Sequence, residues 1–510
     1  MRSEGDHFTG ARDSAAAAAR AWAIDEDGRD RLAFDGIPVA EALAIEVFQA
    51  LLPLALEASG SRSELALQGL AGRLKRQGLD RPARIAGTIV AAARPSRSHA
   101  ERPTLTGSGH DLTAMFVVET PTPSMLGSAL RVAVQLSEGA ITLAAHPGAI
   151  RPFRERGLIV RPLVTPMRLG LRRLVGASRD VRRAWSAIEW RPRPIVLGGI
   201  DVTANALRVI EPIVVRGAPW LAIEREALRA AIGRLQPKWV VVASDQHRIG
   251  RLAVDVARER GPRSLVLQHG LPQFDLGYVP VHADKVAAWS PGAARWFTDH
   301  GTPTDHLIVS GNPRGDDLVA ADREHLRRTI SEGFRPGSKA NLLIALSPSE
   351  RSRNDALVAL GVEFARAQKD VAVIVKLHPG DGDWTATRET VATAGNPRVR
   401  IAHREPLAPL LAWADAVLLH RSTVALEALA AGTPVLLDTP GSQTMDTDLA
   451  TLELPWVDSP GALAATLQAV SGAKARGAFF GHRAAALDEA VGPRDGRTAE
   501  RIATFLRAAG

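Results

Sequence analysis

Short apolar runs alternate with longer amphipathic segments along this chain from residue 115 onward. Runs of apolar and β-branched residues that end at polar residues, Gly or Pro predict buried strands, and the segments between them predict helices. The first series of predicted strands comprises 115–118, 140–145, 158–163, 195–198, 239–243, 264–268 and 286–289. The second series comprises 341–346, 371–377, 399–402, 416–419 and 435–437. This alternation predicts an α/β fold with two doubly wound, mostly parallel sheets.

Two such units in series predict a ligand cleft between them, at the carboxyl ends of the strands. We divide the chain into a helical N-terminal extension with a linker (1–106), a first α/β domain (107–314), a second α/β domain (315–497) and a C-terminal helix (498–510). The predicted helices of the extension are 15–22, 39–56, 64–77 and 83–94, and the Pro-containing run 94–109 is the linker.

Composition agrees with a globular enzyme and narrows its chemistry. The chain has 510 residues, of which 45% are hydrophobic and 23% charged. It has no cysteine, which excludes disulfides, thiolate catalysis and Cys-based metal sites. The N-terminus has no apolar signal region, and the longest apolar stretch, 39–56, is interrupted by Glu41, Glu46 and Pro53, as in an amphipathic helix. We therefore expect a cytoplasmic protein without a membrane span.

The formal net charge of +8 raises the question of an anionic partner. The chain shows no RNA-recognition, zinc-finger or KH signature and has one Tyr, so we expect no nucleic-acid partner. Residues 151–193 hold twelve Arg against three acidic residues, with apolar residues near helical spacing. This pattern predicts a basic amphipathic helix on an anionic surface at the inner face of the cell membrane. The alternative is an apolar stripe that belongs to the core and an Arg face that is solvated.

The segment 418–437 carries the most informative motif. It predicts a strand, a polar turn at Arg421-Ser422-Thr423, a short helix with Glu427, and a second strand after Gly432-Thr433-Pro434. Ser422 suits a helix N-cap, and free amides at a helix start suit a phosphate. Glu427 lies one helical turn past Thr423, where a carboxylate can accept hydrogen bonds from ribose hydroxyls. The alternative is an ordinary βαβ unit with a polar N-cap.

Three further motifs stand at strand ends. Lys376-Leu377-His378-Pro379 ends an apolar strand with a cation and a histidine, which suits a phosphate. Gln268-His269-Gly270 ends the strand 264–268, and Gly311-Asn312-Pro313-Arg314 forms a rigid turn after an apolar run.

The order of these four motifs resembles GT-B glycosyltransferases of bacterial surface polysaccharide synthesis, over about residues 235 to 505. The similar families are the capsule Kdo transferases, the polysialyltransferases and the CDP-glycerol glycerophosphotransferases. The hydrolysing UDP-N-acetylglucosamine 2-epimerases share the fold and are more distant. The resemblance implies two Rossmann-like domains that face a cleft, with the acceptor side in the first domain and the nucleotide-donor side in the second.

The resemblance also implies roles for individual residues. The donor site is expected to comprise Lys376, His378, Ser422, Thr423, Glu427, Ser347, Asn312 and Arg314, with Glu427 on the ribose. The acceptor hydroxyl needs a general base, for which the candidates are His269, Asp245 and Glu119. The alternative for each candidate base is a structural role in its turn.

Other motifs narrow the mechanism. The chain contains no Gly-x-Ser-x-Gly elbow, P-loop or His-Glu-x-x-His sequence. Asp381-Gly382-Asp383 resembles a metal-binding pair, but we expect neither a metal nor a cofactor, because cations and amides can stabilise the leaving phosphate. Leu419 stands eight positions before Glu427, where retaining GT-B enzymes often carry a second Glu, which favours inversion.

The expected function is therefore transfer of a sugar from a nucleotide-activated donor to a glycan or lipid-linked acceptor in cell-surface polysaccharide synthesis. The donor nucleotide is open, with a tilt toward cytidine from the Lys-Leu-His-Pro and Ser-Thr motifs. A glycerophosphotransferase, a sugar-nucleotide 2-epimerase that needs no acceptor, and a non-catalytic nucleotide-sugar-binding protein remain as alternatives.

Overall fold

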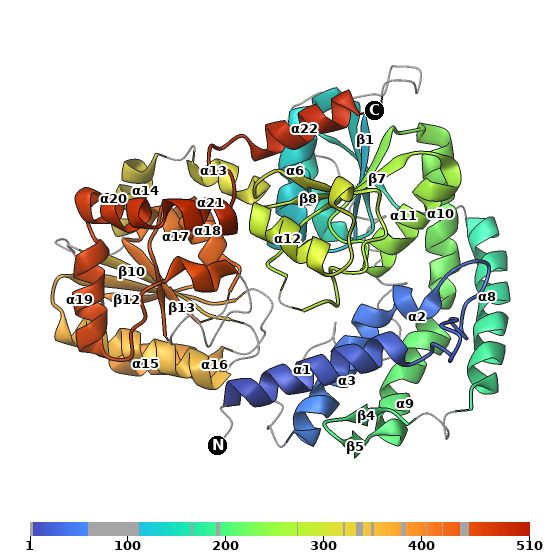
Figure 1. The fold of residues 1–510 in the computed structure, drawn as a ribbon, viewed down its shortest axis with the longest axis horizontal. Coiled ribbons are helices and arrows are strands. Elements are labelled where there is room, and N and C mark those ends of the chain that lie inside the picture. Colours follow the sequence, from blue (N-terminus) through green and yellow to red (C-terminus); the bar gives the residue numbers. More distant parts are fainter. Residues whose placement is uncertain are drawn as a thin grey trace.

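A computed structural model describes residues 4–59, 112–164, 167–189, 194–272, 274–319, 322–332, 340–347, 351–378, 384–403, 405–420, 422–438 and 448–509. The predicted helices 64–77 and 83–94 and the linker 94–109 lie outside these ranges. Figure 1 shows two α/β units side by side, with the N-terminal helices packed beneath the first unit.

The first sheet has seven parallel strands in the order β3-β2-β1-β6-β7-β8-β9. Its strands are β1 (Ala114–Val118), β2 (Ala140–Ala144), β3 (Ile159–Pro162), β6 (Trp239–Val242), β7 (Arg263–Leu267), β8 (Lys285–Ala288) and β9 (Leu307–Val309). β1, β2 and β6 are buried at every position, as expected for strands that are covered on both faces.

One predicted strand of this sheet is wrong. The run 195–198 forms β4 (Val196–Leu197), which pairs antiparallel with β5 (Ile200–Asp201) in a separate hairpin. Gly198 and Gly199 have φ of 56° and 84°, a left-handed geometry that turns the chain back on itself after two residues of strand.

The second sheet has five parallel strands in the order β12-β11-β10-β13-β14. Its strands are β10 (Ala340–Ala345), β11 (Val371–Lys376), β12 (Val399–Ala402), β13 (Ala416–Leu419) and β14 (Val435–Leu437). All five predicted strands of the second series are confirmed within one residue. In both sheets the order reverses beside the first strand, which is the doubly wound arrangement of Rossmann-like domains.

Helices cover both sheets and connect their strands. The α-helices of the first half are α1 (Glu4–Ala21), α2 (Val39–Ala42), α3 (Ala44–Ala58), α6 (Pro123–Leu136), α7 (Ile150–Arg154), α8 (Met167–Ala187), α9 (Thr203–Glu211), α10 (Pro219–Leu235), α11 (Arg248–Arg260) and α12 (Pro291–Asp299). Those of the second half are α13 (Asp316–Val319), α14 (Arg323–Ser331), α15 (Arg351–Ala367), α16 (Thr385–Ala394), α17 (Leu407–Trp413), α18 (Val424–Ala430), α19 (Pro460–Val470), α20 (Ala473–His482), α21 (Ala484–Ala490) and α22 (Thr498–Ala508). Short 3-10 turns and a π-helix, η4 (Pro212–Gly217), join them.

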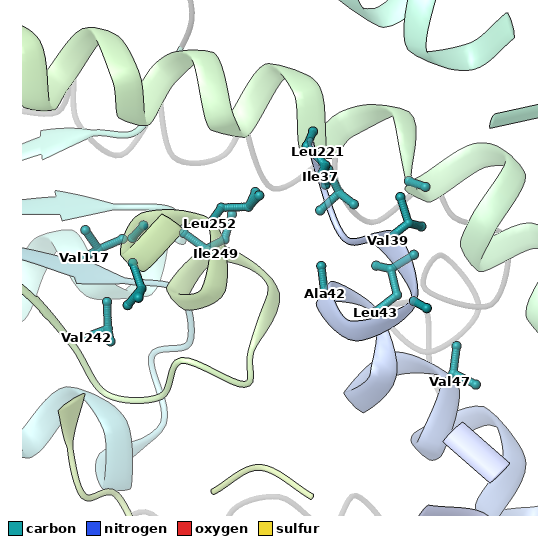
Figure 2. Packing of buried hydrophobic residues seen from close by; sticks show 14 of the residues in the cluster. Ile37, Val39, Ala42, Leu43, Val47, Val117, Leu221, Val242, Ile249 and Leu252 are labelled. Atoms are coloured by element: carbon teal, nitrogen blue, oxygen red, sulfur yellow. The ribbon is translucent and has the colours of Figure 1, made fainter. Parts of the chain in front are cut away.

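The N-terminal helices share one hydrophobic core with the first sheet. The predicted helix 39–56 is split at Leu43 into α2 and α3. Figure 2 shows Ile37, Val39 and Leu43 beside Leu221 of α10, and the same core continues through Leu252 to the sheet. The extension is therefore packed as part of the first unit.

The predicted amphipathic helix is confirmed as α8 (Met167–Ala187), but apolar residues of its second half face inward. Ala177 and Val181 are buried in the core with the N-terminal helices, and Ala184, Trp185 and Ile188 pack against them. The structure therefore favours a core role for this stripe over insertion into a membrane. No described helix is long and apolar enough to cross a bilayer.

The C-terminal helix α22 begins at the predicted residue, Thr498, and ends at Ala508. It crosses from the second unit to the first (Figure 1), where it contacts α6 and places Phe505 against Trp239 at 5.5 Å between ring centres. Ile502, Ala503 and Leu506 are buried in the core of the first sheet. This helix therefore ties the two units together.

Candidate functional site

Each sheet has a switch point, where neighbouring strands connect in opposite directions and open a crevice at their carboxyl ends. In the first sheet this point lies between β1 and β6, so Glu119 and Asp245 flank it. In the second it lies between β10 and β13, flanked by Ser347 and Ser422. The two edges meet, since the hydroxyl of Thr423 accepts a hydrogen bond from the Leu271 amide at 3.4 Å.

The second edge separates the predicted donor residues into two groups. β10 lies between β11 and β13, so His378 stands two strands, or about 10 Å, from Ser422. The Lys376 ammonium donates to the carbonyls of Leu377 at 3.0 Å and His403 at 2.8 Å. Two of its three donors therefore serve the backbone, and burial lowers its pKa. The predicted donor residues therefore lie on two strands that are not neighbours in the sheet.

After β13, the Ser422 hydroxyl accepts from the Val424 amide at 3.2 Å, but the N-cap residue of α18 is Thr423, one residue later than predicted. The helix α18 that follows has only seven residues. His420, at the end of β13, is buried and pairs with Asp438 at 2.7 Å. Ser347, at the end of β10, is buried, with its backbone amide bonded to Asn354 at 3.1 Å.

Arg314 joins the two units at the centre of the site. Its Nη1 pairs with Glu427 Oε1 at 2.8 Å, and its guanidinium lies over the Trp289 ring, 5.0 Å from the ring centre. Its Nε and Nη2 are enclosed and have no acceptor among the described residues, and the same holds for Nδ2 of Asn312, which is 6% exposed. Unmet buried donors are costly, so the donors of this corner are available to an acceptor other than the described residues.

His269 is held in one orientation on the opposite side of the cleft. Its Nδ1 lies 3.0 Å from the Ala243 carbonyl, and its ring stacks on Tyr278 with centres 4.8 Å apart and planes 4° from parallel. A carbonyl partner requires Nδ1–H, which leaves Nε2 as a free acceptor. Burial lowers the pKa of His269 to about 3, and His247 and Arg314 add to this effect. The imidazole is therefore neutral at pH 7.

The other two candidate bases are occupied by backbone amides. Asp245 accepts from the amides of His282 at 2.6 Å and Ala283 at 2.9 Å, and burial raises its pKa. Glu119 accepts from the Ile249 amide at 2.7 Å, in the first turn of α11. These contacts favour the structural alternative for both carboxylates.

A pocket of about 390 Å³ adjoins this cluster between the two units. Leu271, Trp289 and Trp296 line it from the first unit, and Leu426 and Leu449 from the second. The size and the mainly apolar lining suit a small organic ligand. In the part of the chain that the structure describes, no group of three or more His, Asp or Glu residues is placed to hold a metal. Asp381 and Asp383 lie outside that part.

Some residues of this site were not identified from the sequence. Tyr278, the only tyrosine of the chain, stacks on His269, and His247 lies edge-on to the same histidine at 6.2 Å. Tyr278 stands in an irregular connection, where no strand end or motif marks it. His247 lies two residues after Asp245, in the loop that follows β6. Its position near a strand end could have indicated a site residue.

The chain matches no protein-family model, and no curated protein matches it in sequence. Solved structures match it in fold. A protein described as a UDP-N-acetylglucosamine 2-epimerase from Listeria monocytogenes aligns with a TM-score of 0.51 and 13% identity, over 78% of this chain and 96% of that chain. The UDP-GlcNAc 2-epimerase from Neisseria meningitidis, bound to UDP-GlcNAc, aligns with a TM-score of 0.50 and 12% identity, over 78% and 99%. The wall teichoic acid polymerase TagF aligns with a TM-score of 0.47 and 11% identity, over 79% and 91%.

At such identities the first two matches establish the fold alone. Two Rossmann-like units that face each other, with a C-terminal helix that returns to the first, define the GT-B arrangement, so the predicted fold class is confirmed. The resemblance to Kdo transferases and polysialyltransferases stays a prediction.

Proposed function

We propose that this protein is a glycosyltransferase that moves a sugar from a nucleotide-activated donor to a glycan or lipid-linked acceptor in cell-surface polysaccharide synthesis. The observation that carries this proposal is the corner formed by Arg314 and Asn312. It presents three enclosed donors for which the described residues supply no acceptor, at the junction of the two sheet edges. Guanidinium and amide donors are suited to phosphate and sugar oxygens.

The chemistry we propose is a direct displacement at the anomeric carbon, with inversion. His269 Nε2 takes the proton of the acceptor hydroxyl as the new C–O bond forms. The bond from the anomeric carbon to the nucleotide phosphate breaks, and its electron pair goes to the phosphate oxygen. Arg314 stabilises the charge that develops there, because its guanidinium is already in place before the reaction. Thr423 and Glu427 are assigned to the same end of the donor.

Lys376 and His378 are assigned to another part of the donor in this proposal, because β10 separates them from Thr423. The adjoining pocket beside Trp289 is of a suitable size for a monosaccharide unit of the donor or acceptor. The Lys-Leu-His-Pro and Ser-Thr motifs favour a cytidine nucleotide.

A sugar-nucleotide 2-epimerase is the second candidate, because two of the matching structures, with TM-scores of 0.51 and 0.50, are described as UDP-N-acetylglucosamine 2-epimerases. An epimerase acts on its sugar nucleotide without an acceptor, so the two functions differ in one experimental condition.

The test is incubation of the purified full chain with CMP-, CDP-, UDP- and GDP-sugars, with and without acceptor glycans. Release of free nucleotide and transfer of sugar only when an acceptor is present would support the transferase. A change in the sugar nucleotide without acceptor would support the epimerase. Binding of a nucleotide, seen as a rise in melting temperature, without turnover in either condition would overturn both in favour of a non-catalytic binding protein.

A lipid-linked acceptor would bring the protein to a membrane surface. Since the apolar stripe of α8 is buried, contact would rest on its exposed face, which carries Arg172, Arg179, Arg182 and Arg183. Each Arg near an anionic bilayer contributes about 1 kcal/mol, and salt screens this attraction. Sedimentation with anionic but not neutral liposomes, lost at high salt, would support this contact, and equal binding to both would contradict it.

A further inference from the structure

The connection between β7 and β8 is held by the N-terminal helices. Arg20, in the last turn of α1, donates from Nη2 to the Val279 carbonyl at 2.6 Å. Its Nη1 pairs with Asp275 at 3.3 Å. These two partners stand on either side of Tyr278 in the sequence, so one side chain of the N-terminal extension holds the Asp275 carboxylate before the tyrosine and the Val279 backbone after it.

Aromatic contacts hold the same connection at its start. Phe274 packs against Phe48 of α3 with ring centres 5.8 Å apart, and Arg12 of α1 lies over its ring at 4.9 Å. Leu276 is buried with Ala16 and Ala44 in a small cluster that is separate from the main core. α1 and α3 lie side by side (Figure 1), so they act on 274–282 as one surface.

The ring of Tyr278, within this connection, meets the candidate base. Its ring is stacked flat on His269, and a Cβ added to Gly270 would lie 2.7 Å from its hydroxyl oxygen. His269 has one hydrogen bond to the protein among the described residues, to Ala243, and a single bond does not stop the ring from tilting. The flat contact with Tyr278 restricts that motion. Contacts therefore run without a gap from α1 through Tyr278 to His269.

We propose that the N-terminal helical extension is a working part of the site, in which Arg20 and Phe48 are positioning residues that clamp 274–282 and thereby hold Tyr278 against His269. The role of His269 as the base rests on the proposed function. The clamp on 274–282 does not depend on that function. A base must be held within a narrow range of orientations to act, so release of the clamp should slow the chemical step. Donor affinity should be preserved, because Arg314 and Thr423 lie outside 274–282.

Composition supplies a probe that does not depend on activity. The chain has one tyrosine and no cysteine, so nitration with tetranitromethane, followed by nitrotyrosine absorbance, reports Tyr278 without competing thiols. In the wild-type protein we expect slow nitration, because the ring is stacked and half-buried and burial raises the pKa of its hydroxyl above the ordinary value near 10. Tyr278→Phe should give no signal.

The test compares Arg20→Ala, Arg20→Lys and a matched control, Arg29→Ala. The Arg29 side chain is 79% exposed in the same extension and pairs with nearby Asp27, itself 71% exposed, at 3.6 Å. Arg20→Ala should raise the nitration rate of Tyr278 about fivefold or more, because loss of the Arg20 contacts makes local opening of 274–282 more favourable. Arg20→Lys, which keeps the charge opposite Asp275, should lie between Arg20→Ala and wild type. Arg29→Ala should match wild type. Unchanged melting temperatures would show that the effect is local.

Turnover gives the second readout. With a sugar nucleotide that the wild type uses, Arg20→Ala should lower kcat at unchanged KM for the donor, and Arg20→Lys should restore part of it. Wild-type nitration in Arg20→Ala would overturn the clamp, and so would a loss of kcat that occurs without faster nitration. If the wild type converts no sugar nucleotide, the proposed function fails, while the nitration rates still decide the clamp.

Discussion

The two sheet edges that meet at the cleft use their polar residues in opposite ways. At the first edge, Asp245 and Glu119 accept hydrogen bonds from backbone amides, and His269 is fixed between a carbonyl and Tyr278. At the junction with the second edge, Arg314 and Asn312 keep enclosed donors that no described residue satisfies. The described contacts therefore engage both carboxylates of the first edge, whereas they leave enclosed donors of Arg314 and Asn312 at the junction available to a ligand.

This difference teaches that strand-end polarity alone does not identify a functional residue. A residue whose hydrogen-bonding capacity is filled by the backbone stabilises its turn, and a residue with unmet capacity in a buried place is poised for a ligand. Substitutions at the two edges should therefore change turnover and stability by different amounts, and the largest change is expected for Arg314.

Replacement of Arg314 should have the largest effect. Arg314→Ala removes the cation from the leaving phosphate, so we expect turnover to fall by about 10² to 10³ and nucleotide affinity to weaken. Arg314→Lys keeps the charge but not the planar fork and should recover only part. Arg328→Ala, an exposed arginine of α14, is the control. Steady-state kinetics and nucleotide thermal shifts measure both effects. Wild-type turnover in Arg314→Ala would remove the distinction between the two edges.

His269 should affect chemistry without affecting donor binding. His269→Gln keeps a polar side chain but cannot accept the acceptor proton, so kcat should fall by about 10² or more. The thermal shift produced by the nucleotide should stay at the wild-type value, since the donor contacts lie on the other side of the cleft. A weakened nucleotide shift would mean that His269 binds the donor, and the assignment of the base would be wrong.

The carboxylates of the first edge should affect stability more than chemistry. Asp245→Asn and Glu119→Gln weaken acceptors of buried or half-buried amides, which typically costs about 1 to 3 kcal/mol of unfolding free energy. Turnover per folded molecule should stay within a few-fold of wild type. Denaturant melts and activity assays at a temperature where all variants are folded separate the two quantities. A large loss of turnover in a folded Asp245→Asn variant would restore Asp245 as a candidate base.

The pH dependence of stability follows from the buried histidines of the first unit. Burial lowers the pKa of His269 to about 3 and that of His282 to about 4, whereas an unfolded chain binds these protons near 6.5. Below pH 6.5 the unfolded state therefore holds more protons, so the unfolding free energy should fall as the pH drops from about 6.5 toward 4. His269→Gln should reduce this slope in urea melts at several pH values. An equal slope in both proteins would contradict the burial of His269.

Chelation should have the smallest effect. If Arg314 and amide donors stabilise the leaving phosphate, excess EDTA should leave turnover unchanged. Loss of turnover on chelation, with recovery on addition of Mg²⁺ or Mn²⁺, would instead support Asp381 and Asp383 as ligands.

Much of the fold could be predicted because the strands of a doubly wound sheet are buried on both faces. The runs 416–419 and 435–437 coincide with β13 and β14, since continuous apolar residues leave little choice of boundary. The run 399–402 also coincides with β12, an edge strand in which Arg400 is exposed. The hairpin at 195–198 was missed because the run resembles a core strand until the turn at Gly198-Gly199 is known. The split of 39–56 at Leu43 was missed because its apolar spacing continues across the break.

The sequence by itself determined the two parallel sheets, the order of motifs at their carboxyl edges and the C-terminal helix that joins the units. Only the tertiary structure decided which polar residues are available to a ligand. His269, Asp245 and Glu119 share one sequence signature, a polar residue after a buried strand. The hydrogen-bonding groups of such a residue can be satisfied by an amide, by a carbonyl or by neither. Which of these holds depends on segments far away in the chain, such as 282–283 beside Asp245 and α1 behind Tyr278.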